Sequence, residues 1–295
     1  MSKVNITVAA ALAGVALFTV APALAAQCNP KGGFPAFVTE FKKEAAGKGV
    51  SQRGLAALDG VTLDQGVLAA DRKQGVFKQS FEQFSGRMIS RDRLTKGAKL
   101  MQQYAPQLKR IEDKYGVPGP VIVAIWGLET DYGVNQGKLN VVRSVATLAY
   151  DCRRTDKFQA ELTDALRIVD RGDMASADMR GDWAGEIGQT QFLPSSYAKY
   201  AVSFDGRGKP NLVRNAPDVL ASTANYLKNR GWRRGQGWGP GEPNFDAIKE
   251  WNAAEVYAKT IALFADKLNG GNASKADNQA PQKKPARPND KRAAR

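Results

Sequence analysis

Residues 120–130 read PVIVAIWGLET, a nearly continuous apolar run that ends beside a glutamate. The β-branched residues of the run suit a buried strand, whereas its length and the proline at its start suit a buried helix equally well. Glu129 stands at the end of the run, close to aliphatic groups and Trp126. Such surroundings disfavour an ionised carboxylate and raise its pKa, as a general acid near neutral pH requires. A surface glutamate at a helix end is the alternative.

Amphipathic patterns on both sides of this run predict a mainly helical body. Apolar residues recur at steps of three and four over 34–46 and 63–84, which we interpret as an N-terminal helical layer. Ser90 is the predicted N-cap of a helix that runs toward Tyr115 and that Pro106 kinks or divides. Further helices are expected over 158–171, 194–201, 217–230 and 254–268, with a loop at 231–243 and a small irregular or β-containing insertion around 202–213.

The first 25 residues have the pattern of a signal peptide. Lys3 gives a positive start, residues 6–20 are almost wholly apolar, and residues 23–25 read ALA, a small-x-small cleavage site. The apolar run is shorter than the roughly 20 residues that a membrane-spanning helix needs. Because Gln27 rather than a small residue precedes Cys28, we expect no lipid anchor. The prediction is a soluble periplasmic protein whose mature body covers residues 26–268.

Residue counts limit the chemistry. The chain has no histidine, which excludes a Ser-His-Asp triad, a Cys-His nucleophile and an HExxH zinc site. Carboxylates, lysines and tyrosines remain as acid/base groups. Cys28 and Cys152 are the two cysteines, and an oxidising compartment favours joining them, with two unrelated buried thiols as the alternative.

The charge balance points to an anionic partner, since 43 Lys and Arg face 29 Asp and Glu and the net charge is +14. The chain after Asp266 has eight Lys and Arg and two Asp, and therefore carries +6 of that charge. Residues 269–295 lack aromatic and large aliphatic side chains, which predicts a disordered basic tail. We interpret the tail as a tether to an acidic wall or membrane surface, or as an inert extension. Export and the lack of a nucleic-acid-binding motif argue against nucleic acid.

Residues 181–197, GDWAGEIGQTQFLPSSY, form a second candidate segment. Small residues let a ligand approach the backbone, and glutamine side chains pair with sugar hydroxyls and acetamides. A tight loop before the helix at Pro194 is the alternative. Asp131 is a poor partner for Glu129, because positions i and i+2 do not share a helix face. Aromatic residues then recur and either stack on sugars or fill the core: Trp232, Trp238, Trp251 and Tyr257.

Together these segments resemble the lytic murein transglycosylase B family from about Phe34 to Leu268. The resemblance is carried by YGVP at 115–118, GLET at 127–130, ATLAY at 146–150, Arg153-Arg154, GQTQFLPSSY at 188–197, ANYL at 224–227 and GW at 231–232. It implies a mainly α (α+β) protein with a lysozyme-like helical core and one catalytic glutamate matching Glu129. We expect no cofactor. The sugar-contacting positions that it implies are Arg153, Arg154, Gln191, Phe192, Tyr226, Asn252 and Tyr257.

The sequence departs from the family pattern at four positions. Phe84 and Trp251 stand where familiar members have Tyr, Asp182 stands where a small polar residue is usual, and Glu186 stands where some members have Ala. Phe84, Asp182 and Trp251 remain candidate substrate contacts.

The resemblance implies cleavage of peptidoglycan glycan strands, with Glu129 as single acid/base and 1,6-anhydromuramic ends as product. We expect the protein to be a monomer. A hydrolytic muramidase of the same fold, with Asp182, Glu186 or Asp131 as helper carboxylate, is the first alternative. A catalytically silent glycan-binding scaffold is the second.

In better-known members of the family, the loop that matches residues 203–211 resembles an EF-hand and binds calcium. Its alternating positions here are Ser203, Asp205, Arg207 and Lys209, of which one is a carboxylate and two are cations. Calcium needs about 6 to 8 oxygen ligands, so this loop predicts no calcium site.

Overall fold

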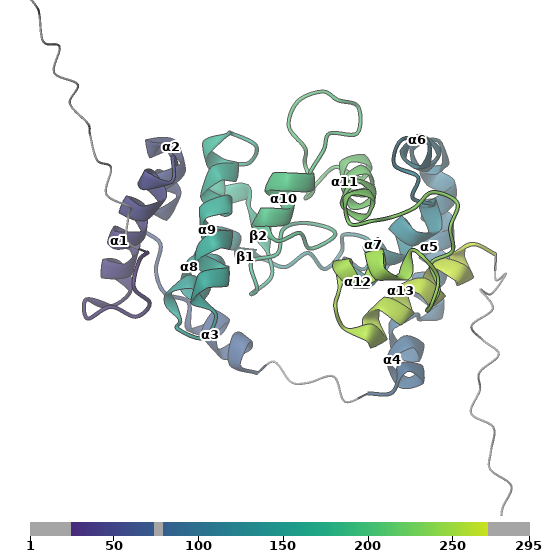
Figure 1. The fold of residues 1–295 in the computed structure, drawn as a ribbon, viewed down its shortest axis with the longest axis horizontal. Helices are drawn as coiled ribbons and strands as arrows, with labels where there is room; N and C mark the ends of the chain where they lie inside the picture. The colour runs from purple at the N-terminus through teal and green to yellow at the C-terminus, as the bar shows by residue number, and fades with distance from the viewer. Residues whose placement is uncertain (1–24, 74–78, 271–295) are drawn as a thin grey trace, which may run out of the picture.

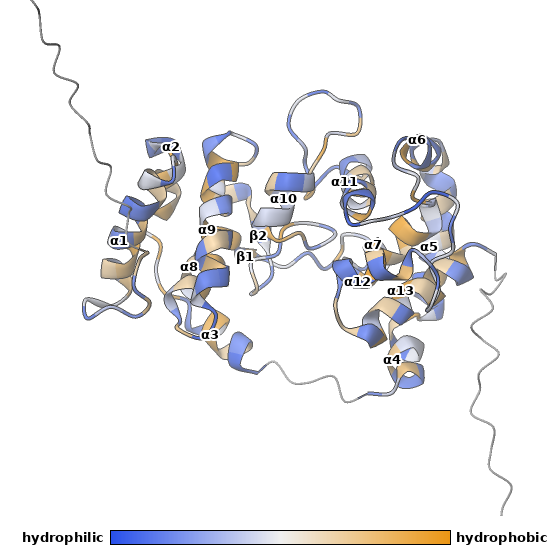
Figure 2. Ribbon diagram, viewed as in Figure 1, coloured by the Kyte–Doolittle hydropathy of each residue, from blue (hydrophilic) through white to orange (hydrophobic). Residues whose placement is uncertain are grey.

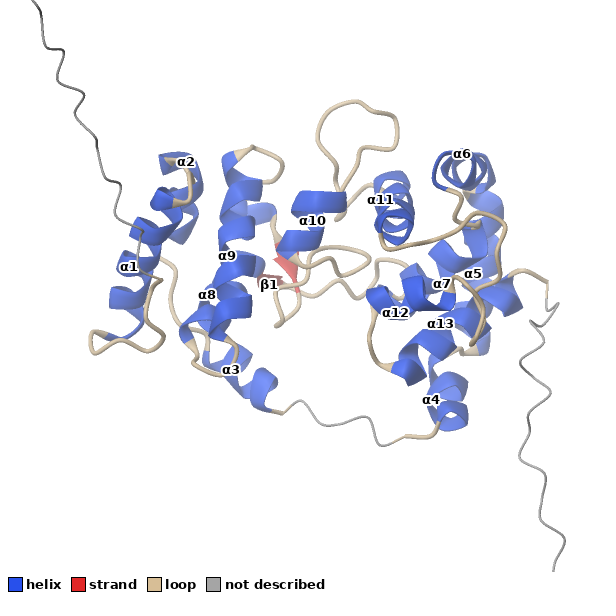
Figure 3. Ribbon diagram, in the orientation of Figure 1, coloured by secondary structure: helices blue, strands red, loops and turns tan. Residues whose placement is uncertain are grey.

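The computed structural model describes residues 25–73 and 79–270 of the 295-residue chain. The predicted signal peptide, apart from its last residue, and residues 271–295 of the predicted tail lie outside the described residues. Helices dominate the described part (Figures 1 and 3). Their bounds are α1 Gly33–Gly47, α2 Gln52–Leu55, α3 Gln65–Arg72, α4 Phe81–Met88, α5 Arg91–Gln103, α6 Ala105–Tyr115, α7 Gly119–Thr130, α8 Val141–Tyr150, α9 Thr155–Asp170, α10 Pro194–Tyr200, α11 Ala216–Asn229, α12 Phe245–Trp251 and α13 Glu255–Leu268, with 3-10 turns at Ala56–Leu58 and Ser176–Asp178.

The central apolar run forms a helix and not a strand. In α7 every residue is buried except Glu129, which is half-buried, so the helix is apolar nearly all round, as a helix enclosed by its neighbours must be. Pro120 lies in the first turn, where its missing N–H costs no intrahelical hydrogen bond. The helix ends at Asp131, which is left-handed with φ of 53°. Helices α5, α6, α11 and α13 pack around α7.

The helices gather in two groups (Figure 1). Helices α1, α2 and α3 pack with α8 and α9, whereas α5 and α13 pack with α7 and α4 packs on α13. Helix α10 contacts both α9 and α11 and so links the groups. Figure 2 shows hydrophobic residues on α7 and a mostly hydrophilic loop between α10 and α11.

Several predicted elements are confirmed and one is divided. Ser90 caps α5 by accepting from the N–H of Arg93, and the helix toward Tyr115 is divided, with Pro106 in the first turn of α6. The helical stretch predicted over 63–84 contains two helices, and only the first belongs to the N-terminal layer: α3 contacts α8, whereas α4 contacts α13. A capping box of Ser80 and Gln83 starts α4 as a new helix.

The predicted insertion takes the irregular one of its two expected forms, and the β structure lies elsewhere. Within the described ranges, the 202–213 segment is irregular, and the one sheet pairs Leu139–Asn140 with Arg180–Gly181 in antiparallel register. The irregular segment is held by Asp218, whose buried carboxylate accepts from the N–H of Phe204 at 2.8 Å and of Asn211 at 2.9 Å. Helices α8 and α12 were not predicted at all.

The first described residues are attached to the helical core. Cys28 and Cys152 form a disulfide, which confirms the predicted pair. The N–H of Ala26 donates to Glu44, and the side-chain amide of Gln159 donates to the carbonyl of Ala26. Among the described residues, no helix has both the length and the apolar content needed to cross a membrane.

Candidate active site

Three helices meet at the carboxyl group of Glu129. Its Oε1 accepts a hydrogen bond from Nε1 of Trp251, the last residue of α12, at 2.9 Å, and another from the hydroxyl of Tyr257 in α13, at 3.0 Å. Both of these hydrogen bonds end on Oε1, and neither involves Oε2. The two donors therefore orient the carboxyl group through one oxygen and leave the other for a ligand.

Burial raises the pKa of Glu129 from 4.5 to about 7. The hydrogen bonds from Trp251 and Tyr257 oppose the rise, because they stabilise the carboxylate, and the negative charge of Asp182 adds to it. Burial, with the neighbouring charge of Glu129, also raises the pKa of Tyr257, so its hydroxyl remains a donor. A carboxyl with these properties exchanges a proton near neutral pH.

Beside Glu129 lies a cavity of about 270 Å³. One wall is aromatic: the ring of Trp251 meets that of Tyr226 edge-to-face at 4.9 Å and that of Phe192 at 5.4 Å. The full lining is Glu129, Glu186, Gln191, Phe192, Leu193, Ser196, Tyr226, Glu250, Trp251, Asn252 and Tyr257. Predicted site residues Gln191, Phe192, Tyr226, Trp251, Asn252 and Tyr257 thus gather around the predicted acid.

Gln189 is a residue of this region that the sequence argument did not single out. Its side-chain oxygen accepts from Nε1 of Trp126 at 2.9 Å, and its carbonyl accepts from the hydroxyl of Thr130. Both partners belong to α7, so Gln189 ties the 181–192 loop to the helix that carries Glu129. The polar composition of residues 181–197 was the signal for it. Leu193, Ser196 and Glu250 were also missed as lining residues.

Two predicted carboxylates have different positions. Asp182 lies near Glu129 but does not line the cavity, and its Oδ1 accepts from the N–H of Glu186 at 3.0 Å. Asp131 pairs instead with Arg93 at 3.3 Å and lies 3.9 Å from Lys96, consistent with the expectation that it does not share the face of Glu129.

Phe84, Arg153 and Arg154 do not line the cavity. Phe84 is buried and packs behind Tyr257, with ring centroids 6.0 Å apart. Both arginines form ion pairs with buried Asp71 on α3. Burial alone would raise the pKa of Asp71, but its hydrogen bonds and ion pairs with the two arginines outweigh burial and lower it.

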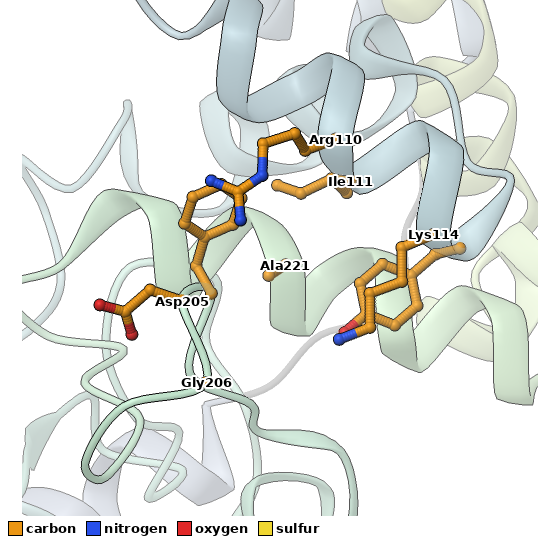
Figure 4. Close-up of a pocket in the computed structure, with 8 residues that line it drawn as sticks. Arg110, Ile111, Lys114, Asp205, Gly206 and Ala221 are labelled. Atoms are coloured by element: carbon orange, nitrogen blue, oxygen red, sulfur yellow. The ribbon is translucent and has the colours of Figure 1, made fainter.

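A second cavity of about 270 Å³ lies between α6, α11 and the loop before α11 (Figure 4). The guanidinium of Arg110 stacks over the ring of Phe204 at 4.4 Å. Asp205 accepts from the hydroxyl of Ser203 at 2.8 Å and from the N–H of Arg207 at 2.9 Å, and this carboxylate is therefore used within its own loop. Of the two cavities, only the first contains a carboxyl with a raised pKa.

The two cationic residues of this loop, Arg207 and Lys209, differ in their surroundings. Lys209 pairs with Asp173 at 2.9 Å, and Arg207 is exposed. In the part of the chain that the structure describes, no group of three or more Asp, Glu or Cys residues is arranged to hold a metal ion. The absence of a calcium site stays a prediction.

Comparison with known proteins identifies the family. A family model described as "Transglycosylase SLT domain" matches residues 33–241. The membrane-bound lytic murein transglycosylase B of Escherichia coli K12 is 37% identical over 166 residues, which are 54% of this chain and 46% of that protein. The match thus spans about half the length of this relative.

Solved structures support the same assignment. SltB3 from Pseudomonas aeruginosa, in complex with NAG-anhNAM-pentapeptide, has a TM-score of 0.76 and 32% identity, over 81% of this chain and 80% of that chain. SltB1 from the same organism has a TM-score of 0.73 and 26% identity, over 79% and 98%. An E. coli lytic transglycosylase in complex with calcium has a TM-score of 0.70 and 26% identity, over 79% and 92%. Given the match over most of its length and the shared fold, the chain belongs to the transglycosylase SLT domain family.

Proposed function

We propose that the protein is a lytic transglycosylase of peptidoglycan, with Glu129 as its single general acid/base. The observation that carries the proposal is the geometry of this carboxyl. Trp251 and Tyr257 hold Oε1, and the pKa is raised to about 7 beside an open cavity. Family membership supports the same activity.

The reaction needs one proton donor that later becomes an acceptor. Glu129 protonates the oxygen between N-acetylmuramic acid and N-acetylglucosamine, and the bond from that oxygen to C1 breaks. The acetamide oxygen of the muramic sugar stabilises the developing cation at C1. The 6-hydroxyl of the same muramic sugar then attacks C1 and gives its proton to the Glu129 carboxylate. A 1,6-anhydro sugar forms, no water is consumed, and Glu129 regains its proton.

The lining of the cavity suits this substrate. The ring of Trp251, against which the buried ring of Phe192 packs, offers an apolar face to a sugar ring, and Gln191 and Asn252 offer amides for hydroxyl and acetamide groups. The Nε2 atom of Gln191 donates to the carbonyl of Gly188 at 2.6 Å, and this hydrogen bond fixes the direction of the Gln191 side chain. These residues are the proposed sugar contacts.

Arg153 and Arg154 belong to a different part of the proposed glycan path. They lie where α8 leads into α9, and Asp71 compensates one of their two charges. We infer that they meet anionic groups of a strand longer than the cavity holds. Export to the periplasm by residues 1–25 belongs to the same proposal, because the substrate is in the cell wall.

A hydrolytic muramidase is the second candidate, because another carboxyl, Glu186, lines the same cavity. Mass spectrometry of fragments released from purified murein separates the candidates. Anhydro ends, lighter by one water than reducing ends, are expected from the wild-type protein and not from Glu129→Gln. Reducing ends would identify a muramidase, and no release by the wild type would leave a glycan-binding scaffold.

A further inference from the structure

Glu186 differs from the other carboxyl groups of the site in its hydrogen bonds. Its backbone is fixed, since its N–H donates to Asp182 at 3.0 Å and its carbonyl accepts from the N–H of Asp182 at 3.3 Å. Its side chain lines the cavity with Glu129. No hydrogen bond from the rest of the described chain reaches its carboxyl oxygens, whereas Glu129 receives two and Asp182 receives backbone N–H donors.

These contacts decide which carboxyl keeps a proton. Neighbouring carboxylates cannot all ionise without repulsion, and donors stabilise the ionised form. Asp182 is the best solvated by N–H groups and Glu186 the worst. Burial raises the pKa of Glu186 well above its usual value, and the charges of Asp182 and Glu129 raise it further.

The remaining charged and titratable neighbours of Glu186 do not change the conclusion that Glu186 holds its proton more strongly than Asp182. Lys157 lowers the pKa of Glu186, but it is exposed and its ammonium lies 5.5 Å from the ring centre of Phe158. Glu161 raises it, and Tyr257 is an uncharged donor to Glu129. The balance around Glu186 is therefore negative.

We propose that Glu186 is a specificity-determining residue that stays protonated and donates a hydrogen bond to the acetamide carbonyl of a bound N-acetyl sugar. A protonated carboxyl needs an acceptor, and an amide carbonyl is a strong neutral acceptor on such a sugar. Anionic acceptors are repelled by the carboxylate of Asp182. The inference rests on the proposed function and adds to it, because a protonated Glu186 does not deprotonate water and so favours the anhydro product.

Two variants test this with peptide-free murein glycan strands as substrate. Glu186→Gln retains the volume and an N–H donor, so its kcat/KM should stay within about threefold of the wild-type value. Glu186→Ala removes the donor, and kcat/KM should fall about tenfold, mainly through KM, as expected for one lost hydrogen bond. Glu255→Gln is the control, because Glu255 is exposed on α13 and pairs with Lys259.

The pH profile provides the readout that a structural role would not move. Glu186→Gln removes no charge if Glu186 is protonated, so the fall of activity at high pH should stay at the wild-type position. If Glu186 were an anion, its loss would lower the pKa of Glu129 and shift that fall to lower pH, which would overturn the inference. A wild-type kcat/KM in folded Glu186→Ala would overturn it too. Failure of the proposed function is recognised separately, by reducing ends or by an active Glu129→Gln.

Discussion

Replacing Glu129 with glutamine should stabilise the fold by an amount that grows with pH. An unperturbed glutamate carboxyl has a pKa of 4.5, whereas Glu129 in the folded protein has a pKa of about 7. Between these values the folded protein keeps a proton that the unfolded chain has released, so the free energy of unfolding falls as pH rises, and levels off above about 7. One pKa unit corresponds to about 1.36 kcal/mol, which makes the total cost of ionising Glu129 about 3 kcal/mol.

Glutamine at this position does not titrate and still offers Oε1 to Trp251 and Tyr257. The variant should therefore match the wild type near pH 4.5 and exceed its unfolding free energy by about 3 kcal/mol at pH 8. Urea denaturation of both proteins at pH 4.5, 6 and 8 measures the difference. Glu255→Gln serves as control and should gain nothing as pH rises, since Glu255 is exposed and its pKa is lowered, chiefly by its hydrogen bond with Lys259.

The activity of Glu129→Gln should fall even though its stability rises. The variant has no proton to transfer, and general acid/base catalysis contributes about 10²- to 10⁴-fold, so murein release should fall by at least about a hundredfold. Wild-type activity should decline as pH rises through about 7, where Glu129 ionises. A stability difference that is equal at pH 4.5 and pH 8 would refute the electrostatic reasoning. Near-normal murein release by the variant would refute the catalytic assignment.

Three further predictions concern regions away from the cavity. The denatured, unreduced mature protein should show no free thiol, and reducing the Cys28–Cys152 bond should cost about 2 to 5 kcal/mol, because it closes a long loop; two titratable thiols would contradict this. Deleting the residues after Leu268 should weaken binding to intact sacculi at low salt and leave cleavage of small soluble fragments unchanged; equal binding at every salt concentration would favour an inert tail. Melting curves in calcium and in chelator should superimpose, since Asp205 is the one carboxylate at the alternating loop positions and is already hydrogen-bonded; a rise of several degrees with calcium and not with magnesium would contradict this.

Local signals in the sequence were enough to predict much of the helical framework. Ser90 and Pro106 act through the backbone within one turn, so their cap and division could be predicted without the fold. The apolar content of residues 120–128 determined that the segment is buried. Its structure as a helix did not follow, because burial on every side removes the periodicity that separates a helix from a strand.

Only the tertiary structure decided how the site is arranged. Trp251 and Tyr257 reach Glu129 across 122 and 128 residues, and no local pattern records such a contact. The raised pKa of Glu129 was predicted from its apolar neighbours, but its value reflects burial and donors brought together by α7, α12 and α13. Sequence resemblance grouped Arg153 with the sugar contacts, whereas the fold pairs it with Asp71 outside the cavity. Residue types and their order determined which acid/base groups are available. Long-range packing determined which of these groups lie close enough to change one another's pKa.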